Sequence, residues 1–192
     1  KMIKFIQGND ACVEAALLAG CRFYAGYPIT PSTEIAEGMA RQLPGLGGTF
    51  VQMEDEIASL GAVIGASICG LKSLTATSGP GFSLKQEHIG YAVLAEVPCV
   101  IVNVMRGGPS TGTVIYSQQE LNLTCFGGNG EGFRIVYSAS NVQEMYYLAI
   151  KAFQTAWKYR FPTFVMSDGY LAKTLTEVEV YTPEEKNIDL IQ

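Results

Sequence analysis

The chain is poor in basic residues and has a single histidine. Its 192 residues include 13 lysines and arginines against 18 acidic residues, for a net charge of −5. Because the few basic residues are scattered, a broad nucleic-acid surface is excluded, and an anionic substrate would need one well-placed arginine. With one histidine and no nucleophile-elbow motif, serine–histidine–aspartate hydrolysis has no support.

Cysteines are few and far apart. No Cys-x-x-Cys spacing occurs among Cys12, Cys21, Cys69, Cys99 and Cys125. Neither a zinc site nor an iron–sulfur cluster is therefore encoded within the chain, and we predict no metal ligands. Buried, reduced thiols are the expected state, which fits a cytoplasmic location.

Long hydrophobic runs are also missing. The most apolar stretch, Ile57–Cys69, is shorter than the roughly 18 to 20 residues of a membrane span and is rich in glycine and alanine. The segment Lys1–Gly8 looks like a strand and lacks the cleavage site of a signal peptide. We expect one domain over residues 1–174 and, over the polar end 175–192, a tail or a linker to a further domain.

Helical and strand patterns alternate along the chain, which predicts a mostly parallel sheet covered on both faces. Strands are expected at Arg22–Gly26, Thr49–Met53, Ser73–Thr77, Val100–Met105, Phe133–Tyr137 and Thr163–Ser167. Helices are expected at Asp10–Ala19, Ser32–Leu43, Glu54–Cys69, Gly81–Leu94, Gln118–Phe126 and Asn141–Tyr159. Ser32 or Thr33 should cap the second helix and Ser140 the last. The fold class is therefore α/β, a doubly wound domain of about six strands.

Four short segments each follow an expected strand, so they should meet at the carboxyl edge of the sheet, where ligands bind in open α/β folds. They are Tyr27–Ser32, Glu54–Glu56, Thr77–Gly81 and Met105–Gly108. Each alone has a structural explanation, such as a rigid turn or a helix start. A loop without periodicity follows at Gly107–Ser117, and loops of that length are often functional. Together these segments predict a ligand site.

The acidic segment precedes a helix that is apolar on nearly every side. Carboxylates favour the positive end of a helix dipole, which could explain all three acids. Because that helix must be buried, at least one of Glu54, Asp55 and Glu56 should be partly buried, with a raised pKa. Such a carboxyl could exchange a proton near neutral pH.

The turn Ser78–Gly81 lacks the ending of a P-loop and the Gly-x-Gly-x-x-Gly of a dinucleotide fold. It retains a backbone that another group can approach closely. Arg106 leaves an apolar strand into glycines, where a guanidinium suits bidentate binding of a carboxylate, although an ordinary loop arginine would give the same pattern. His88 is expected at a helix surface or interface rather than in catalysis.

With these segments the chain resembles the amino-terminal domain of the α subunit of 2-oxoacid:ferredoxin oxidoreductases, thiamine diphosphate enzymes that include pyruvate:ferredoxin oxidoreductase. The resemblance runs from Gly8 to about Lys173, and its most specific elements are Tyr27–Ser32, Gln52–Ala58, Thr75–Ser83 and Arg106–Gly112. It implies the pyrimidine-binding domain of the thiamine diphosphate fold. A separate β subunit would hold the diphosphate, Mg²⁺ and a [4Fe-4S] cluster, since the diphosphate-binding Gly-Asp-Gly motif is missing here.

The resemblance implies catalytic roles for Glu56, Thr30 and Arg106. Glu56 matches the cofactor-activating glutamate, whose carboxyl bonds the pyrimidine nitrogen and favours the imino tautomer that removes the thiazolium C2 proton. Thr30 and Arg106 match the residues that contact the 2-oxoacid carboxylate, with Ser110 and Thr111 as further substrate contacts. The other implied cofactor-binding residues are Tyr27, Pro28, Ile29, Ser78, Gly79 and Pro80.

The family reaction is oxidative decarboxylation of a 2-oxoacid, with coenzyme A accepting the acyl group and ferredoxin the electrons. The loop Pro109–Gly112 looks most like that of the 2-oxoglutarate group, so 2-oxoglutarate is the expected substrate. The chain departs from the family pattern at Gln118–Glu120, where Gln-Gly-Asp is usual, and at Asn129, where a histidine often occurs. Two alternatives stay open: a pyrimidine-domain subunit of a non-oxidative thiamine diphosphate decarboxylase or synthase, and a non-catalytic assembly module.

Overall fold

Six parallel strands form the centre of the structure, a computed structural model that describes residues 1–185. Their order across the sheet is β3, β2, β4, β5, β8, β7, and β6 pairs antiparallel with β5 beside this path. Their bounds are β2 Phe23–Gly26, β3 Thr49–Gln52, β4 Ser73–Thr77, β5 Val100–Gly107, β6 Thr113–Tyr116, β7 Ile135–Ser138 and β8 Thr163–Asp168. The predicted α/β class with a mostly parallel sheet is confirmed.

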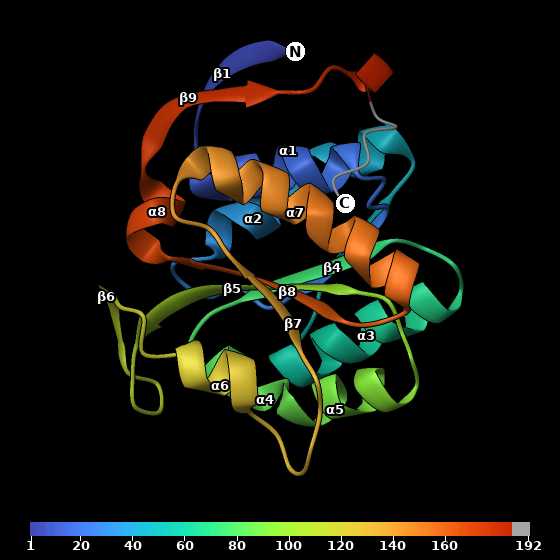
Figure 1. Cartoon of the computed structure of the whole chain (residues 1–192), viewed down its shortest axis with the longest axis vertical. Coiled ribbons are helices and arrows are strands. Elements are labelled where there is room, and N and C mark those ends of the chain that lie inside the picture. Colours follow the sequence, from blue (N-terminus) through green and yellow to red (C-terminus); the bar gives the residue numbers. More distant parts are fainter. Residues whose placement is uncertain (186–192) are drawn as a thin grey trace.

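Helices cover both faces of this sheet (Figure 1). One face carries α1 (Gly8–Leu18), α2 (Thr33–Gln42) and α7 (Val142–Tyr159), and the other carries α3 (Glu56–Ile68), α4 (Pro80–Leu84), α5 (Gln86–Leu94) and α6 (Leu121–Phe126). Because successive strand residues point to opposite faces, the central strands supply both apolar cores. In β8, for example, Val165 packs in the core under α1 and α7, whereas Phe164 packs in the core under α3 and α5.

A separate two-stranded ribbon lies outside α1 and α7, at the top of Figure 1. It pairs β1 (Met2–Gln7) antiparallel with β9 (Leu175–Val180). The strand character expected of Lys1–Gly8 is confirmed, and residues 175–180 of the expected tail form β9. The domain boundary at residue 174 stays a prediction, and residues 186–192 of that tail lie outside the described residues.

Several element predictions were inexact at the ends. The expected helix Gly81–Leu94 is two helices, α4 and α5, which meet at Lys85. The cap of α7 is Asn141, whose side chain accepts the Glu144 N–H at 2.8 Å; Ser140 instead donates to the Glu144 carboxylate, so the prediction for Ser140 was wrong. The short elements η1 (Pro44–Leu46), α8 (Gly169–Lys173) and η2 (Pro183–Glu185) were not predicted.

The cysteine prediction was right for three of the five thiols. All five are free, and Cys12, Cys21 and Cys99 are buried, but Cys69 is exposed at the end of α3 and Cys125 is half-buried. Burial raises the pKa of each of the three buried thiols to about 12, which keeps them protonated and unreactive. None of the helices in the described part of the chain is long and apolar enough to cross a bilayer.

Candidate functional site

The four predicted segments do meet at the carboxyl edge of the sheet. Tyr27–Ser32 and Glu54–Glu56 follow β2 and β3, whereas Thr77–Gly81 and Met105–Gly108 begin within the last residues of β4 and β5. Contacts join them in pairs. The Arg106 guanidinium donates to the Thr30 carbonyl at 3.0 Å, across 76 residues of sequence. Across β2, which lies between β3 and β4 in the sheet, the carboxylate of Glu56 lies against Gly81.

The three acids between β3 and α3 have different surroundings. Glu54 is exposed. Asp55 caps α3, because its carboxylate accepts the Ala58 N–H at 2.7 Å. Glu56 is the first residue of α3 and only 5% exposed. The expectation that at least one of these acids is buried is confirmed, and Glu56 is that residue.

The glycine turn after β4 leaves room for the Glu56 side chain. A Cβ at position 81 would lie 2.5 Å from Oε1 and 2.8 Å from Cγ of Glu56, so only glycine fits. Thr77 Oγ1 faces the same Gly81, and it is buried without a hydrogen-bond partner, as is Ser78 Oγ. Buried hydroxyls without partners are uncommon in folded proteins, which marks this turn as a place prepared for a ligand.

Arg106 is buried, with 6% of its surface exposed, at the end of β5. Its Nη1 donates to the Thr30 carbonyl, and its Nη2 donates to the Thr111 carbonyl at 2.6 Å. Nε has no partner. The aliphatic part and Nε pack against Gly79, whose φ is +54° and where a Cβ would lie 2.7 Å from Nε. The guanidinium therefore joins the loops after β2, β4 and β5.

A buried carboxylate that the sequence did not single out for a role supports this arginine. Glu120 accepts the Arg106 main-chain N–H at 2.8 Å and the Asn103 amide at 3.3 Å. Burial raises the pKa of Glu120, while hydrogen bonds from the main chain of Arg106 and Gly79 act to lower it. The residue was noted only as a departure from the family's usual aspartate.

Asn9 anchors the loop after β2 with hydrogen bonds from its side chain. The Asn9 amide donates to the Pro31 carbonyl at 2.8 Å and to the Glu34 carboxylate at 2.9 Å. The peptide bond between Thr30 and Pro31 is cis. Tyr27, Pro28 and Thr30 are exposed and Ile29 is half-buried. The predicted cofactor and substrate residues of this loop thus lie at the surface of the chain, on a backbone fixed by buried contacts.

The loop after β5 presents the other predicted substrate contacts. Ser110 and Thr111 are both exposed, and Ser110 has a positive φ of 56°. After this loop comes β6, which the sequence analysis did not predict because Thr113–Tyr116 is exposed and shows no alternation. The Tyr116 ring packs against Gly169 of α8, so a fifth segment after β8 also reaches this edge.

Two further residues that contact this region, Lys85 and Asp168, were not singled out from the sequence. Lys85, between α4 and α5, is fully buried and donates to the Glu56 carbonyl at 2.9 Å. Asp168, at the end of β8, caps α8 and accepts from Gln118 at 3.2 Å. Neither has a local signal in the sequence. His88 is half-buried on α5 beside Gly61 of α3, in agreement with the interface expected for it.

These residues are of the kinds that could hold the pyrimidine half of thiamine diphosphate. They combine a carboxyl at a helix start, an unpaired buried hydroxyl of Ser78 and the largely exposed, partly apolar surface of Tyr27–Ile29. Within residues 1–185, no cluster of three or more histidine, cysteine or acidic side chains could hold a metal ion.

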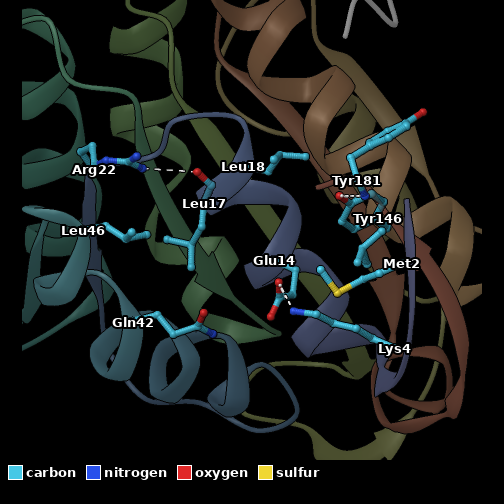
Figure 2. Close-up of a pocket in the computed structure, with 11 residues that line it drawn as sticks. Met2, Lys4, Glu14, Leu17, Leu18, Arg22, Gln42, Leu46, Tyr146 and Tyr181 are labelled. Carbon is cyan, nitrogen blue, oxygen red and sulfur yellow. Dashed lines mark hydrogen bonds and ion pairs between the residues drawn. The ribbon is translucent and has the colours of Figure 1, made fainter. Parts of the chain in front are cut away.

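A cavity of about 350 Å³ lies elsewhere, between α1, α2 and the β1–β9 ribbon (Figure 2). It is lined by the Lys4–Glu14 ion pair, by Arg22, which donates to the Leu17 carbonyl, and by aliphatic and tyrosine side chains. None of the predicted site residues lines it.

Comparison with known proteins places this arrangement in a family. A sequence profile for pyruvate flavodoxin/ferredoxin oxidoreductase, thiamine diphosphate-binding, matches residues 14–192. The chain is 59% identical over 190 residues to the 2-oxoglutarate synthase subunit KorA of Methanocaldococcus jannaschii, covering 98% of this chain and 51% of the relative. It is 44% identical over 171 residues to the ketoisovalerate oxidoreductase subunit VorB of Methanothermobacter thermautotrophicus, covering 88% and 49%.

A solved structure agrees with these relatives. The 2-oxoglutarate:ferredoxin oxidoreductase from Magnetococcus marinus, with 2-oxoglutarate, coenzyme A and succinyl-CoA bound, superimposes with a TM-score of 0.93 at 44% identity, over 96% of this chain and 32% of that one. The chain spans about half the length of the curated relatives that it matches. From the profile match and these identities, the chain belongs to the family of thiamine diphosphate-binding domains of pyruvate flavodoxin/ferredoxin oxidoreductases.

Proposed function

We propose that the chain supplies the pyrimidine-binding half of the active site of a 2-oxoglutarate:ferredoxin oxidoreductase. The observation that carries this proposal is the buried Glu56, held against Gly81 at the edge where Arg106 joins three loops. The names and identities of the relatives support it.

Glu56 is the proton-exchanging group in this proposal. The main chain of Glu56 is fixed because it begins α3, and the missing side chain at Gly81 leaves the space that the Glu56 carboxyl occupies. The Glu56 carboxyl holds a proton at the ring nitrogen of the pyrimidine and moves it as the cofactor is activated. Bound thiamine diphosphate supplies the carbanion chemistry that splits a 2-oxoacid next to its carbonyl. Tyr27, Pro28, Ile29, Ser78, Gly79 and Pro80 form the wall for the pyrimidine.

Arg106 and Thr30 bind the substrate carboxylate in this proposal. The guanidinium is held by carbonyl oxygens rather than by a carboxylate of the chain, so its positive charge is not neutralised by an ion pair within the described residues. The Glu120 carboxylate acts electrostatically on this guanidinium without forming an ion pair with it, so a ligand carboxylate can still pair with the guanidinium directly. Ser110 and Thr111, exposed on the loop after β5, complete the substrate side.

We infer 2-oxoglutarate as the substrate, because four relatives named as 2-oxoglutarate synthase subunits are 50–59% identical, against 44% for a ketoisovalerate enzyme. The rest of the enzyme would come from partners. A β subunit would hold the diphosphate, Mg²⁺ and a [4Fe-4S] cluster. Coenzyme A would accept the acyl group and ferredoxin the electrons, and a cytoplasmic location would suit this chemistry.

The first experiment compares the purified chain with the chain co-expressed with the β subunit of the same organism. Both are supplied with thiamine diphosphate, Mg²⁺, coenzyme A, a viologen dye and 2-oxoglutarate, pyruvate or 2-oxoisovalerate. Dye reduction should need the β subunit and be fastest with 2-oxoglutarate. Dye reduction by the chain alone would contradict the shared site, and aldehyde release without dye reduction would indicate the non-oxidative alternative.

The second experiment replaces Glu56 by glutamine in the assembled enzyme. Glutamine keeps the size but cannot relay a proton, so exchange of the thiamine C2 proton should fall on the order of 100-fold or more. Glu54→Gln is the matched control, since Glu54 is exposed two residues away. Equal exchange in E56Q and wild type would remove Glu56 from this role.

A further inference from the structure

Lys85 is a buried cation that neither the proposed reaction nor the ion pairs of residues 1–185 account for. Its side chain is completely buried, and among residues 1–185 its ammonium donates one hydrogen bond, to the main-chain carbonyl of Glu56 at 2.9 Å. None of the ion pairs in the described residues includes Lys85. An ammonium group buried without a carboxylate partner is costly, so the fold alone gives no reason for a lysine here.

The position of Lys85 connects it with the carboxyl that we propose to be catalytic. Lys85 directly follows α4 as its C-cap, and Gly81 is the second residue of that short helix. Gly81 lies against the Glu56 carboxylate, and Lys85 binds the Glu56 carbonyl. The short segment of α4 and its C-cap therefore contacts Glu56 at both the side chain and the main chain, and Lys85 makes the main-chain hydrogen bond.

We propose that Lys85 is a positioning residue for Glu56. The Lys85 ammonium fixes the first turn of α3 against α4, and its charge is coupled to the charge of the Glu56 carboxyl. The inference rests on the proposed function, because it concerns the same carboxyl. It names a residue that acts through Glu56 and does not touch the substrate.

The charges around Lys85 agree with this coupling. Burial lowers the pKa of Lys85 to about 7, and the nearby acids Glu56 and Asp55 of α3 act to raise it. On α5, His88 is the next titratable group that faces α3, and Glu87 is exposed. Because the charge of Glu56 acts to raise the Lys85 pKa, removing that charge must lower it.

The test measures this effect of Glu56 on Lys85 in the full chain, without cofactor or partner. The Cε chemical shift of Lys85, in chain labelled with ¹³C-lysine and assigned by its absence in Lys85→Met, is followed against pH. The midpoint should lie near pH 7 in the wild type and fall by about 1 pH unit in Glu56→Gln, the effect expected on losing one nearby opposite charge. Glu87→Gln, two residues from Lys85 in sequence, should leave the midpoint unchanged.

A second measurement follows C2 proton exchange in the assembled enzyme with Lys85→Met and Lys85→Arg. Without the ammonium, the Met variant should lose at least about 10-fold in exchange, and the acid limb of its pH profile should move to higher pH. Arginine, which keeps the charge and a donor, should restore part of the rate. Lys158→Met, an exposed lysine at the end of α7, is the control.

Three results would overturn the inference. They are an unchanged Lys85 midpoint in E56Q, wild-type exchange with a wild-type pH profile in K85M, and a K85M chain that does not fold at neutral pH, since the lysine would then serve the fold. Absence of C2 exchange in the wild-type assembled enzyme is a different result and contradicts the proposed function.

Discussion

The Glu120 carboxylate accepts the main-chain N–H of Arg106 at 2.8 Å, so a buried acid holds the backbone of the residue that we propose binds the substrate. Glu120 is the N-cap residue of α6, and its carboxylate also accepts a hydrogen bond from the Asn103 amide. The main chain of Arg106 and Gly79 and the Asn103 side chain all donate hydrogen bonds to it. An acceptor with several oxygen lone pairs is what this position requires.

Replacing Glu120 by alanine should therefore destabilise the chain and weaken substrate binding. Donors left unpaired in a buried place cost about 1 to 3 kcal/mol, and the loop that carries Arg106 loses its anchor. Urea unfolding of the chain gives the stability change, and steady-state kinetics of the assembled enzyme gives KM for the 2-oxoacid. Glu120→Gln should be intermediate, because its amide nitrogen would face a donor. The exposed change Glu87→Gln should alter neither quantity.

Alanine at position 81 should act on Glu56 without any change of charge. The new Cβ would meet the Glu56 carboxylate, so either α3 or α4 must move, at a cost of about 1 to 3 kcal/mol. Gly65→Ala is the matched control, because position 65 is exposed in α3 with no atom within 4 Å of a Cβ there. That change should stabilise the helix by about 0.5 to 1 kcal/mol. If both variants unfold at the same urea concentration, the close approach of Gly81 and Glu56 is not present in solution.

The burial of Lys85 predicts a specific dependence of stability on pH. Its pKa is about 7 in the folded chain, against 10.5 ordinarily. Between these values the unfolded chain binds a proton that the folded chain does not, so the free energy of unfolding should rise with pH across this window. Below about pH 7 both states hold the proton, and the full cost of burial is present.

Lys85→Met should remove that slope. At about 1.4 kcal/mol for each pKa unit, the variant should gain on the order of 4 kcal/mol at pH 7, less what the lost hydrogen bond contributes. Urea unfolding at several pH values from 6 to 10.5 measures both chains. Parallel curves for the two chains would show that Lys85 titrates normally.

Arg106→Ala should cost roughly 2 to 5 kcal/mol in kcat/KM for the 2-oxoacid, because it removes a charge that pairs with the substrate. Thr30→Val should cost about 1 to 3 kcal/mol by deleting one hydrogen bond. Thiamine diphosphate affinity should stay nearly unchanged in both variants, and a change at the exposed Arg41 should have no effect. A wild-type kcat/KM for R106A would leave the guanidinium with only its structural contacts to Thr30 and Thr111.

Local sequence patterns were sufficient for the six parallel strands, for most of the helices between them and for the edge of the sheet at which the candidate site lies. Period-two and period-3.6 hydrophobic patterns identify buried strands and amphipathic helices wherever the chain places them, and glycines and prolines mark the turns between. Parallel strands then bring Tyr27–Ser32, Glu54–Glu56, Thr77–Gly81 and Met105–Gly108 to one edge. Their juxtaposition follows from topology, and so it could be predicted without knowing any contact.

What only the tertiary structure decided depends on residues far apart in the chain. Glu54, Asp55 and Glu56 at the start of α3 have one local pattern. Only Glu56 is buried, because Gly81 and Lys85, 25 and 29 residues away, pack against it. Arg106 reaches Thr30 across 76 residues, and β9 pairs with β1 from the opposite end of the domain. Whether Lys85 and Glu120 are solvated or buried is set by the helices and strands that close over them. A single sequence determines residue types and local periods, whereas burial and partners depend on packing between segments, and that packing exists only in the folded chain.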